Sequence, residues 1–152
     1  MTVPSEEMQE RSRLVMEALA AAIGRDTAGV DDAMNALAEK GWSALYGAVL
    51  AFGTAVQKVC QLEPADGQLM GVLVVNAATG ERGSLEDIGL GPELEAAIRI
   101  FLAWGNGDTE MATGIFYDAV KRGAGHDVIS AALAWASHLI RAELQRKEAE
   151  CP

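Results

Sequence analysis

Residues 42–60 read WSALYGAVLAFGTAVQKVC, and this stretch decides the fold class. Its larger apolar side chains recur at helical spacing and form one broad face, made of Leu45, Tyr46, Val49, Phe52, Gly53 and Val56. Polar residues are few, so we predict a helix from about Trp42 to Cys60 that is the most buried element of its half. Alanine is abundant and aromatics make up only 5% of the chain, which favours packed helices over strands. The sequence therefore predicts an all-α fold.

Two shorter helices are predicted upstream of this stretch. Residues 5–24 carry apolar side chains at helical spacing, and Gly24 breaks the pattern. Asp26-Thr27 then offers an N-cap for a second helix with Val30, Ala33, Met34 and Leu37 on its inner face. Lys40-Gly41 closes that helix, because a cation suits the last turn and glycine suits the position just beyond it.

The same pattern returns about 82 residues later in the chain. Pro92 occupies the predicted first position of a helix, and the break and cap at 24–27 have a counterpart in Gly105-Asn-Gly-Asp108-Thr109. The next helix ends at Lys121-Arg-Gly123, as the earlier one ends at Lys40-Gly41. In the last helix, Leu133-Ala-Trp-Ala-Ser137 matches Leu50-Ala-Phe-Gly-Thr54 position by position.

These matches predict an internal duplication rather than a solenoid, which needs at least three stacked repeats. The alternative is that helical bundles share generic caps and glycine stops. We predict a six-helix bundle built from two pseudo-repeated three-helix units, at about 5–60 and 92–148, within a single helical domain of residues 1–152.

The connector between the units, residues 61–91, differs in kind. Residues 62–67 are rich in turn formers, and residues 69–76 form an apolar, β-branched run that is too short for a good helix. Residues 82–85 are positioned to return as a second strand. We predict a short β-hairpin, or at least an extended connector, packed on the helices because a lone hairpin is marginal.

The charge balance bears on partners. Twelve basic against 22 acidic residues give a net charge of −10, which argues against nucleic acid and against anionic membranes. The first residues lack the charged and apolar regions of a signal peptide, and no apolar run reaches about 20 residues. Two distant cysteines, Cys60 and Cys151, fit a reducing compartment. We expect a cytoplasmic protein, and the alanine-, glycine- and arginine-rich composition suggests a GC-rich bacterial source.

No catalytic, metal or cofactor signature stands out. His126 is followed directly by Asp127, but adjacent residues on a helix point about 100° apart, and His138 does not share the face of His126. The acidic pairs fit first turns of helices, where the helix dipole favours them. Gly105 to Thr109 lacks the third glycine of a dinucleotide site and the lysine of a phosphate loop, so a capped helix start is favoured.

Aromatic side chains are the remaining candidates for a groove or an interface. Most fit core positions, whereas Trp104 and Trp135 lie off the central apolar stripe of their predicted helices. Tryptophan is enriched in interface hot spots. The candidate residues are Trp104, Trp135, Trp42, Phe101 and Phe116. Gly47, Gly53 and Gly114 lie inside predicted helices, and close helix approach, within the chain or across a dimer, would offset their cost.

We therefore expect a non-enzymatic binding or interaction protein, with a protein partner or a second copy of itself on an acidic helical surface. A homodimer is the favoured form. One alternative is a small-molecule binder or enzyme with an apolar pocket between the two units. A weaker alternative is an acidic antitoxin or immunity-like inhibitor of a basic protein.

Overall fold

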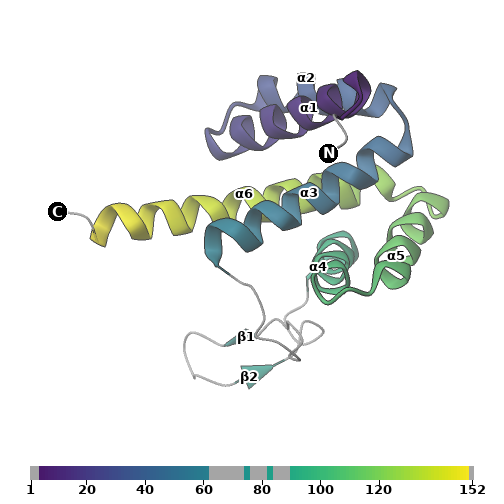
Figure 1. Ribbon diagram of the computed structural model, residues 1–152. Helices are drawn as coiled ribbons and strands as arrows, with labels where there is room; N and C mark the ends of the chain where they lie inside the picture. The colour runs from purple at the N-terminus through teal and green to yellow at the C-terminus, as the bar shows by residue number, and fades with distance from the viewer. Residues whose placement is uncertain (1–3, 62–73, 76–81, 84–89, 151–152) are drawn as a thin grey trace. The chain divides into compact units, whose positions relative to one another are not determined.

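The computed structural model describes residues 4–61, 74–75, 82–83 and 90–150, and this part of the chain is almost entirely helical (Figure 1). Its six helices are α1 (Glu6–Ile23), α2 (Thr27–Glu39), α3 (Trp42–Cys60), α4 (Pro92–Gly105), α5 (Thr109–Lys121) and α6 (Gly125–Glu150). The all-α prediction is confirmed. The chain divides into two compact units, residues 1–61 with 132–152 and residues 62–131, and each is described by itself.

In the first unit, α1 packs along α2, and both helices contact α3. The buried side chains of α1 recur every three or four residues, as an amphipathic helix requires. The core of these three helices consists of Leu14, Val15, Ala18, Leu19, Ala33, Leu37, Ala44, Leu45, Ala48, Val49, Phe52 and Val56. Alanine supplies a third of that set, so the helices meet through small side chains.

The turn between α1 and α2 is built by local hydrogen bonds. The amide of Asp26 donates to the carbonyl of Ala21 at 2.8 Å and closes α1, with Arg25 in the left-handed region at φ 59°. The Asp26 side chain then accepts from the amide of Gly29 at 3.0 Å and caps α2. The predicted helix break and N-cap are both confirmed.

The helix α3 forms as the apolar pattern of 42–60 predicts, and its predicted apolar face is buried except for Tyr46, which is half-buried. Within the described residues, it is the one helix long and apolar enough to cross a membrane by length and composition, with a mean hydropathy of 1.2. Core helices of soluble proteins satisfy the same criterion. The expectation of no membrane partner therefore stays a prediction.

In the second unit, α4 and α5 pack together and repeat the turn of the first unit. The amide of Asp108 donates to the carbonyl of Ala103 at 2.8 Å, with Gly107 at φ 82°. The Asp108 side chain accepts from the amide of Met111 at 3.0 Å. Residues 105–109 are thus a capped helix start, as predicted.

The end of α5 differs from the end of α2. At α5 the amide of Ala124 donates back to Ala119 at 2.8 Å, across Gly123 at φ 77°. At α2 the amides of Lys40 and Gly41 make shorter-range bonds, to Leu37 and Ala38. The wider turn at α5 accommodates the additional residue in that loop.

Two short strands in the connector, β1 (Val74–Val75) and β2 (Arg82–Gly83), pair antiparallel, with Val74 opposite Gly83. These residues fall within the two predicted strands. The rest of the predicted hairpin lies outside the described residues, so the hairpin stays a prediction, as does the internal duplication.

Candidate functional site

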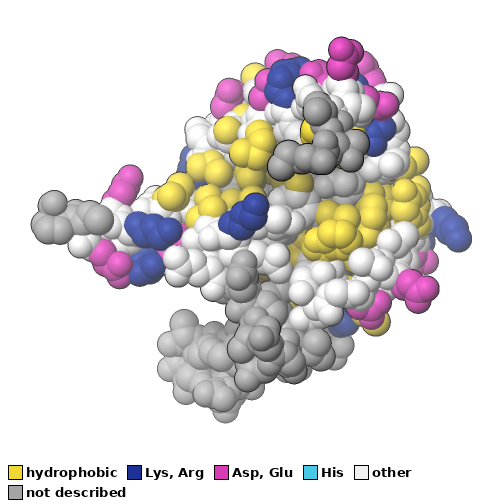
Figure 2. Space-filling model, in the orientation of Figure 1, with side chains coloured by type: hydrophobic (Ala, Val, Ile, Leu, Met, Phe, Trp, Pro, Cys, Tyr) yellow, Lys and Arg dark blue, Asp and Glu magenta, His cyan; other side chains and the backbone are white. Residues whose placement is uncertain are grey.

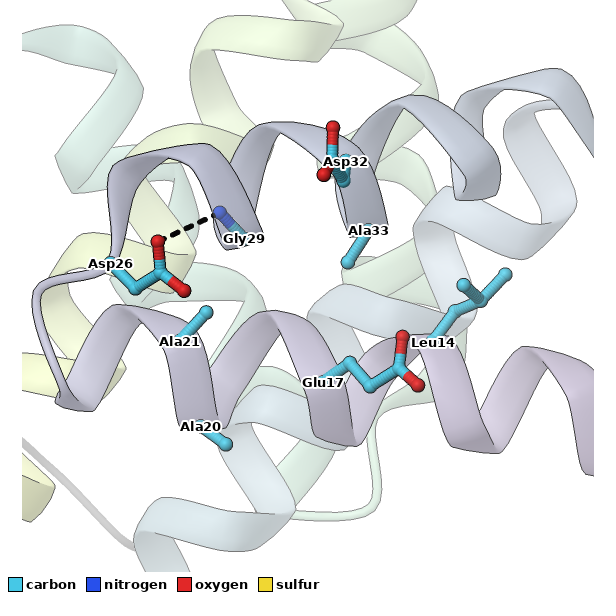
Figure 3. A pocket seen from close by; sticks show the side chains of 8 residues that line it. All are labelled: Leu14, Glu17, Ala20, Ala21, Asp26, Gly29, Asp32 and Ala33. Atoms are coloured by element: carbon cyan, nitrogen blue, oxygen red, sulfur yellow. Dashed lines mark hydrogen bonds between the residues drawn. The ribbon is translucent and has the colours of Figure 1, made fainter.

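Two surface hollows in the first unit are lined entirely by described residues, and α1 contributes to both. The larger, which we call the acidic pocket, lies between α1 and α2 and has a volume of about 570 Å³. Figure 3 shows Ala21 and Ala33 pointing between the helices, Glu17 rising from α1, and Asp26 at the start of α2. The pocket is lined by Leu14, Glu17, Ala20, Ala21, Asp26, Gly29, Asp32 and Ala33.

The acidic pocket exists because its two walls carry small side chains. Alanine occupies three of the lining positions, and the one buried large residue among them is Leu14, at 4% exposure. Gly29 leaves room for the cap, since a Cβ there would lie 2.6 Å from Asp26 Oδ2 and 3.1 Å from the Ala21 Cβ and would displace the carboxylate. The glycine therefore lets the capping carboxylate sit between the start of α2 and the side of α1.

Three carboxylates give this pocket its charge. The Asp26 carboxylate is engaged by the amide of Gly29, and Glu17 forms an ion pair with Arg13 on the next turn of α1. Arg13 also donates to Glu10, from Nε at 2.9 Å, and this hydrogen bond lowers the pKa of Glu10. Hydrogen bonds to Glu10 and Glu17 in turn raise the pKa of Arg13, so its guanidinium stays charged.

The carboxylates of the pocket are not arranged as a metal site. Within the described ranges, no group of three or more histidine, cysteine, aspartate or glutamate side chains is close enough to hold a metal ion. These carboxylates are hydrogen-bond acceptors that lie beside the apolar side chains of the pocket. Figure 2 shows acidic side chains interspersed with basic ones over α1 and α2, beside apolar patches.

The second hollow, which we call the apolar groove, lies between α1 and α3 and has a volume of about 330 Å³. Two methionines of α1 flank it, with Met8 61% and Met16 62% exposed. Its α3 side carries glycine, serine and alanine. The lining residues are Met8, Arg11, Ser12, Val15, Met16, Ser43, Ala44, Gly47, Ala48 and Ala51.

Arg11 is the one charged residue that lines the apolar groove. Its Nη2 donates to Glu7 Oε1 at 2.8 Å. Its Nε is buried and has no hydrogen-bond partner within the described part of the chain. A buried donor without an acceptor lowers the free energy of unfolding by about 1–3 kcal/mol, so an acceptor placed beside this nitrogen would be favourable.

The aromatic residues singled out from the sequence fall in both units. Phe116 and Phe101 are buried, at 0% and 8% exposure, and Phe116 meets the ring of Tyr117 edge to face at 5.2 Å. Trp104 is 37% exposed, whereas Trp42 and Trp135 are half-buried. Within the first unit, neither hollow described above is lined by an aromatic residue.

The remaining titratable candidates lie apart from both hollows. His126 and His138 are exposed. Cys60 is half-buried, as predicted, and its Sγ lies 4.0 Å from the carbonyl oxygen of Leu139 on α6. Burial, with help from nearby Glu143, raises the pKa of the Cys60 thiol. The thiol is therefore neutral at physiological pH and a weak nucleophile.

Sequence reasoning did not single out the two hollows. A hollow depends on which small residues face each other across two helices, and periodicity does not report this. Close helix approach within the described part of the chain does not account for Gly47 or Gly114, since a Cβ at either would meet no atom of another element within 4 Å. Close approach across a dimer stays a prediction for them. Gly47 instead lies on the open floor of the apolar groove.

Comparison with known proteins adds no relative: no protein family matches the chain, and neither the curated proteins nor the solved structures contain a match.

Proposed function

We propose that this chain is a non-enzymatic binding protein that engages a basic segment of a protein partner through the acidic pocket between α1 and α2. The observation that carries the proposal is that Ala21 and Ala33, which point between the two helices (Figure 3), line the same pocket as the carboxylates of Glu17 and Asp32. Lysine and arginine match this combination, because each has an apolar stem and a cationic head.

The overall charge supports the same class of partner. A net charge of −10 attracts basic proteins and steers their approach. Two of the three pocket carboxylates remain available to a partner in part: Glu17 is held only by an exposed ion pair, and Asp32 is exposed. An exposed pair of this kind contributes about 1 kcal/mol or less, so a partner cation can compete for Glu17.

We further propose that the two halves arose by duplication, and that the pocket is particular to the first half. The α1–α2 turn and the α4–α5 turn share three features. In each, the amide of an aspartate donates to the carbonyl five residues earlier, the residue before that aspartate is left-handed, and the aspartate side chain caps the next helix. An offset of about 82 aligns Asp26 with Asp108 and places Arg99, Leu102, Met111, Gly114 and Ile115 opposite Glu17, Ala20, Gly29, Asp32 and Ala33.

This alignment bears on whether the pocket is a by-product of the scaffold. In the second half, larger apolar residues replace Ala20, Gly29 and Ala33, and an arginine replaces Glu17. The turn and the cap are retained, so the fold does not require the small and acidic residues of the first half. Small and acidic residues that occupy these positions in one half alone support a binding role for that half.

The test is binding of immobilised lysine- and arginine-containing peptides, with acidic peptides as reference. The double variant Glu17→Gln, Asp32→Asn removes two rim charges and leaves the cap residue Asp26 in place. We expect affinity for the selected basic peptide to fall about threefold to tenfold, since each exposed pair is worth about 0.2–1 kcal/mol. Added salt is expected to weaken wild-type binding strongly.

The matched control is Asp31→Asn, Glu39→Gln, which removes two exposed negative charges from α2 at positions that do not line the pocket. It is expected to weaken binding less, through net charge alone. Equal losses in the two double variants, or no saturable binding of any basic peptide, would contradict the proposal. Native mass spectrometry tests the homodimer separately: a dimer that excludes basic peptides would assign this face to self-association instead.

A further inference from the structure

The apolar groove is lined by a glycine, Gly47, that no close contact with another described element requires. Gly47 lies in the interior of α3, where glycine costs about 0.5–1 kcal/mol relative to alanine. Apart from its chain neighbours and the backbone of its own helix turn, no atom of the described residues lies within 4 Å of the position its Cβ would take. The missing side chain leaves the groove open along the backbone of α3, between Met8 and Met16 of α1.

The charge in the groove has one sign. Of its ten lining residues, Arg11 is charged, Ser12 and Ser43 are polar, and the others are apolar or glycine. No carboxylate lines it, although the chain carries an excess of ten negative charges. Among the described residues, the buried Arg11 Nε–H has no acceptor, and Arg11 Nη2 donates to Glu7, whose side chain is 63% exposed. The groove therefore contains no carboxylate that could accept a hydrogen bond from the Nε side of the Arg11 guanidinium.

We propose that the apolar groove binds a small apolar carboxylate, such as a medium-chain fatty acid. The carboxylate pairs with the Arg11 guanidinium, and the hydrocarbon chain lies on Ala44, Ala48 and the open backbone at Gly47. A volume of about 330 Å³ is at the small end of the range for ligand sites, about 300–1,000 Å³. Methionine adapts to chains of different shape, so Met8 and Met16 can close over the ligand.

This site is independent of the acidic pocket, which lies on the α2 side of α1 and has different lining residues. Its chemistry is also the opposite: the pocket presents carboxylates to a cation, and the groove presents a cation to a carboxylate. Failure of either proposal leaves the other standing.

The test is titration of the isotope-labelled full chain with decanoate, followed by NMR, with decanol as the uncharged reference. We expect saturable shifts of the methyl signals of Met8, Met16 and Ala48, and decanoate affinity at least about tenfold above that of decanol. Arg11→Gln is expected to remove this preference and to leave decanol binding unchanged. Gly47→Leu fills the groove and is expected to abolish binding of both ligands.

Two matched variants control for charge and helix propensity. Arg13→Gln removes an arginine from α1 outside the groove, and Gly114→Leu places leucine at the other open helical glycine. Both are expected to bind decanoate like the wild type, and circular dichroism checks that every variant is folded. Equal binding of decanoate and decanol, shifts outside the groove, or no saturable binding would overturn the proposal.

Discussion

The guanidinium of Arg141 donates from Nη2 to the carbonyl oxygen of Ala22 at 2.9 Å, across 119 positions of the sequence. Its Nε donates to the carbonyl of the next residue, Ile23, at 3.2 Å. The last turn of α1 holds no basic residue of its own. Arg141, on α6, thus supplies the cation that the carbonyl end of α1 lacks; it binds the carbonyl of Ile23 and adds a second hydrogen bond to that of Ala22, which also accepts from the amide of Arg25 at 3.1 Å.

Arg141→Gln is expected to lower the free energy of unfolding by about 1–3 kcal/mol, because it removes two charge-assisted hydrogen bonds at a half-buried helix end. Urea unfolding measures the effect. The control is Arg122→Gln, which breaks an exposed pair with Asp118 and is expected to cost less than about 1 kcal/mol. Equal losses in the two variants would show that the capping bonds of Arg141 contribute little.

The left-handed residue of the α1–α2 turn offers a second prediction. Arg25 adopts φ 59°, whereas Gly107 takes the same place in the α4–α5 turn at φ 82°. Arg25→Gly relieves a conformation that costs a side chain about 1 kcal/mol, partly offset by the greater freedom of glycine in the unfolded chain. We expect thermal stability to rise slightly or stay unchanged. Gly107→Ala is expected to lower stability by about 1 kcal/mol. A gain from Gly107→Ala would contradict this account.

Two glycines in helices are expected to respond oppositely to alanine. At Gly114 the added Cβ meets no atom within 4 Å, so Gly114→Ala is expected to stabilise the fold by about 0.5–1 kcal/mol. At Gly29 the Cβ would approach Asp26 and Ala21 too closely, so Gly29→Ala displaces the cap, which is worth about 1 kcal/mol. Chemical unfolding of the two variants is expected to show that Gly29→Ala gives no gain. A similar gain in both would mean that the capping carboxylate moves freely.

The helix ends could be predicted from sequence because their chemistry is local. Gly24, Asp26 and Asp108 act on residues three to five positions away, within reach of a pattern argument. The Arg141 bond to Ala22 could not be predicted in this way, since it joins residues far apart in the chain. The same holds for Gly29, whose need for a missing side chain depends on Ala21 of the neighbouring helix.

The candidate sites were less accessible to sequence than the fold. Large aromatic residues drew attention as interface candidates, yet the hollows of the first unit are formed by alanine and glycine. Small residues at helical spacing look alike whether they pack closely or leave space. Gly29 and Gly47 illustrate the two cases: a Cβ would clash at the first and meet nothing at the second. Only the positions of neighbouring helices distinguish them.

The end of α6 gives a prediction about pH. Arg146 holds the Glu143 carboxylate with two hydrogen bonds, at 2.6 and 3.0 Å, and these lower the pKa of Glu143. Since the pKa in the folded state lies below that of the unfolded chain, the pair stabilises the fold above the unfolded value. The contribution is lost as the pH falls through the folded value.

We therefore expect the NMR titration of the Glu143 side-chain carbon to move to higher pH in Arg146→Gln. The difference in stability between this variant and the wild type is expected to be small, since the pair is exposed, and to disappear in acid. Added salt is expected to shrink the shift in the titration, because it screens the surface pair. An unchanged Glu143 titration in the variant would show that the helix end frays in solution and that the pair is not formed.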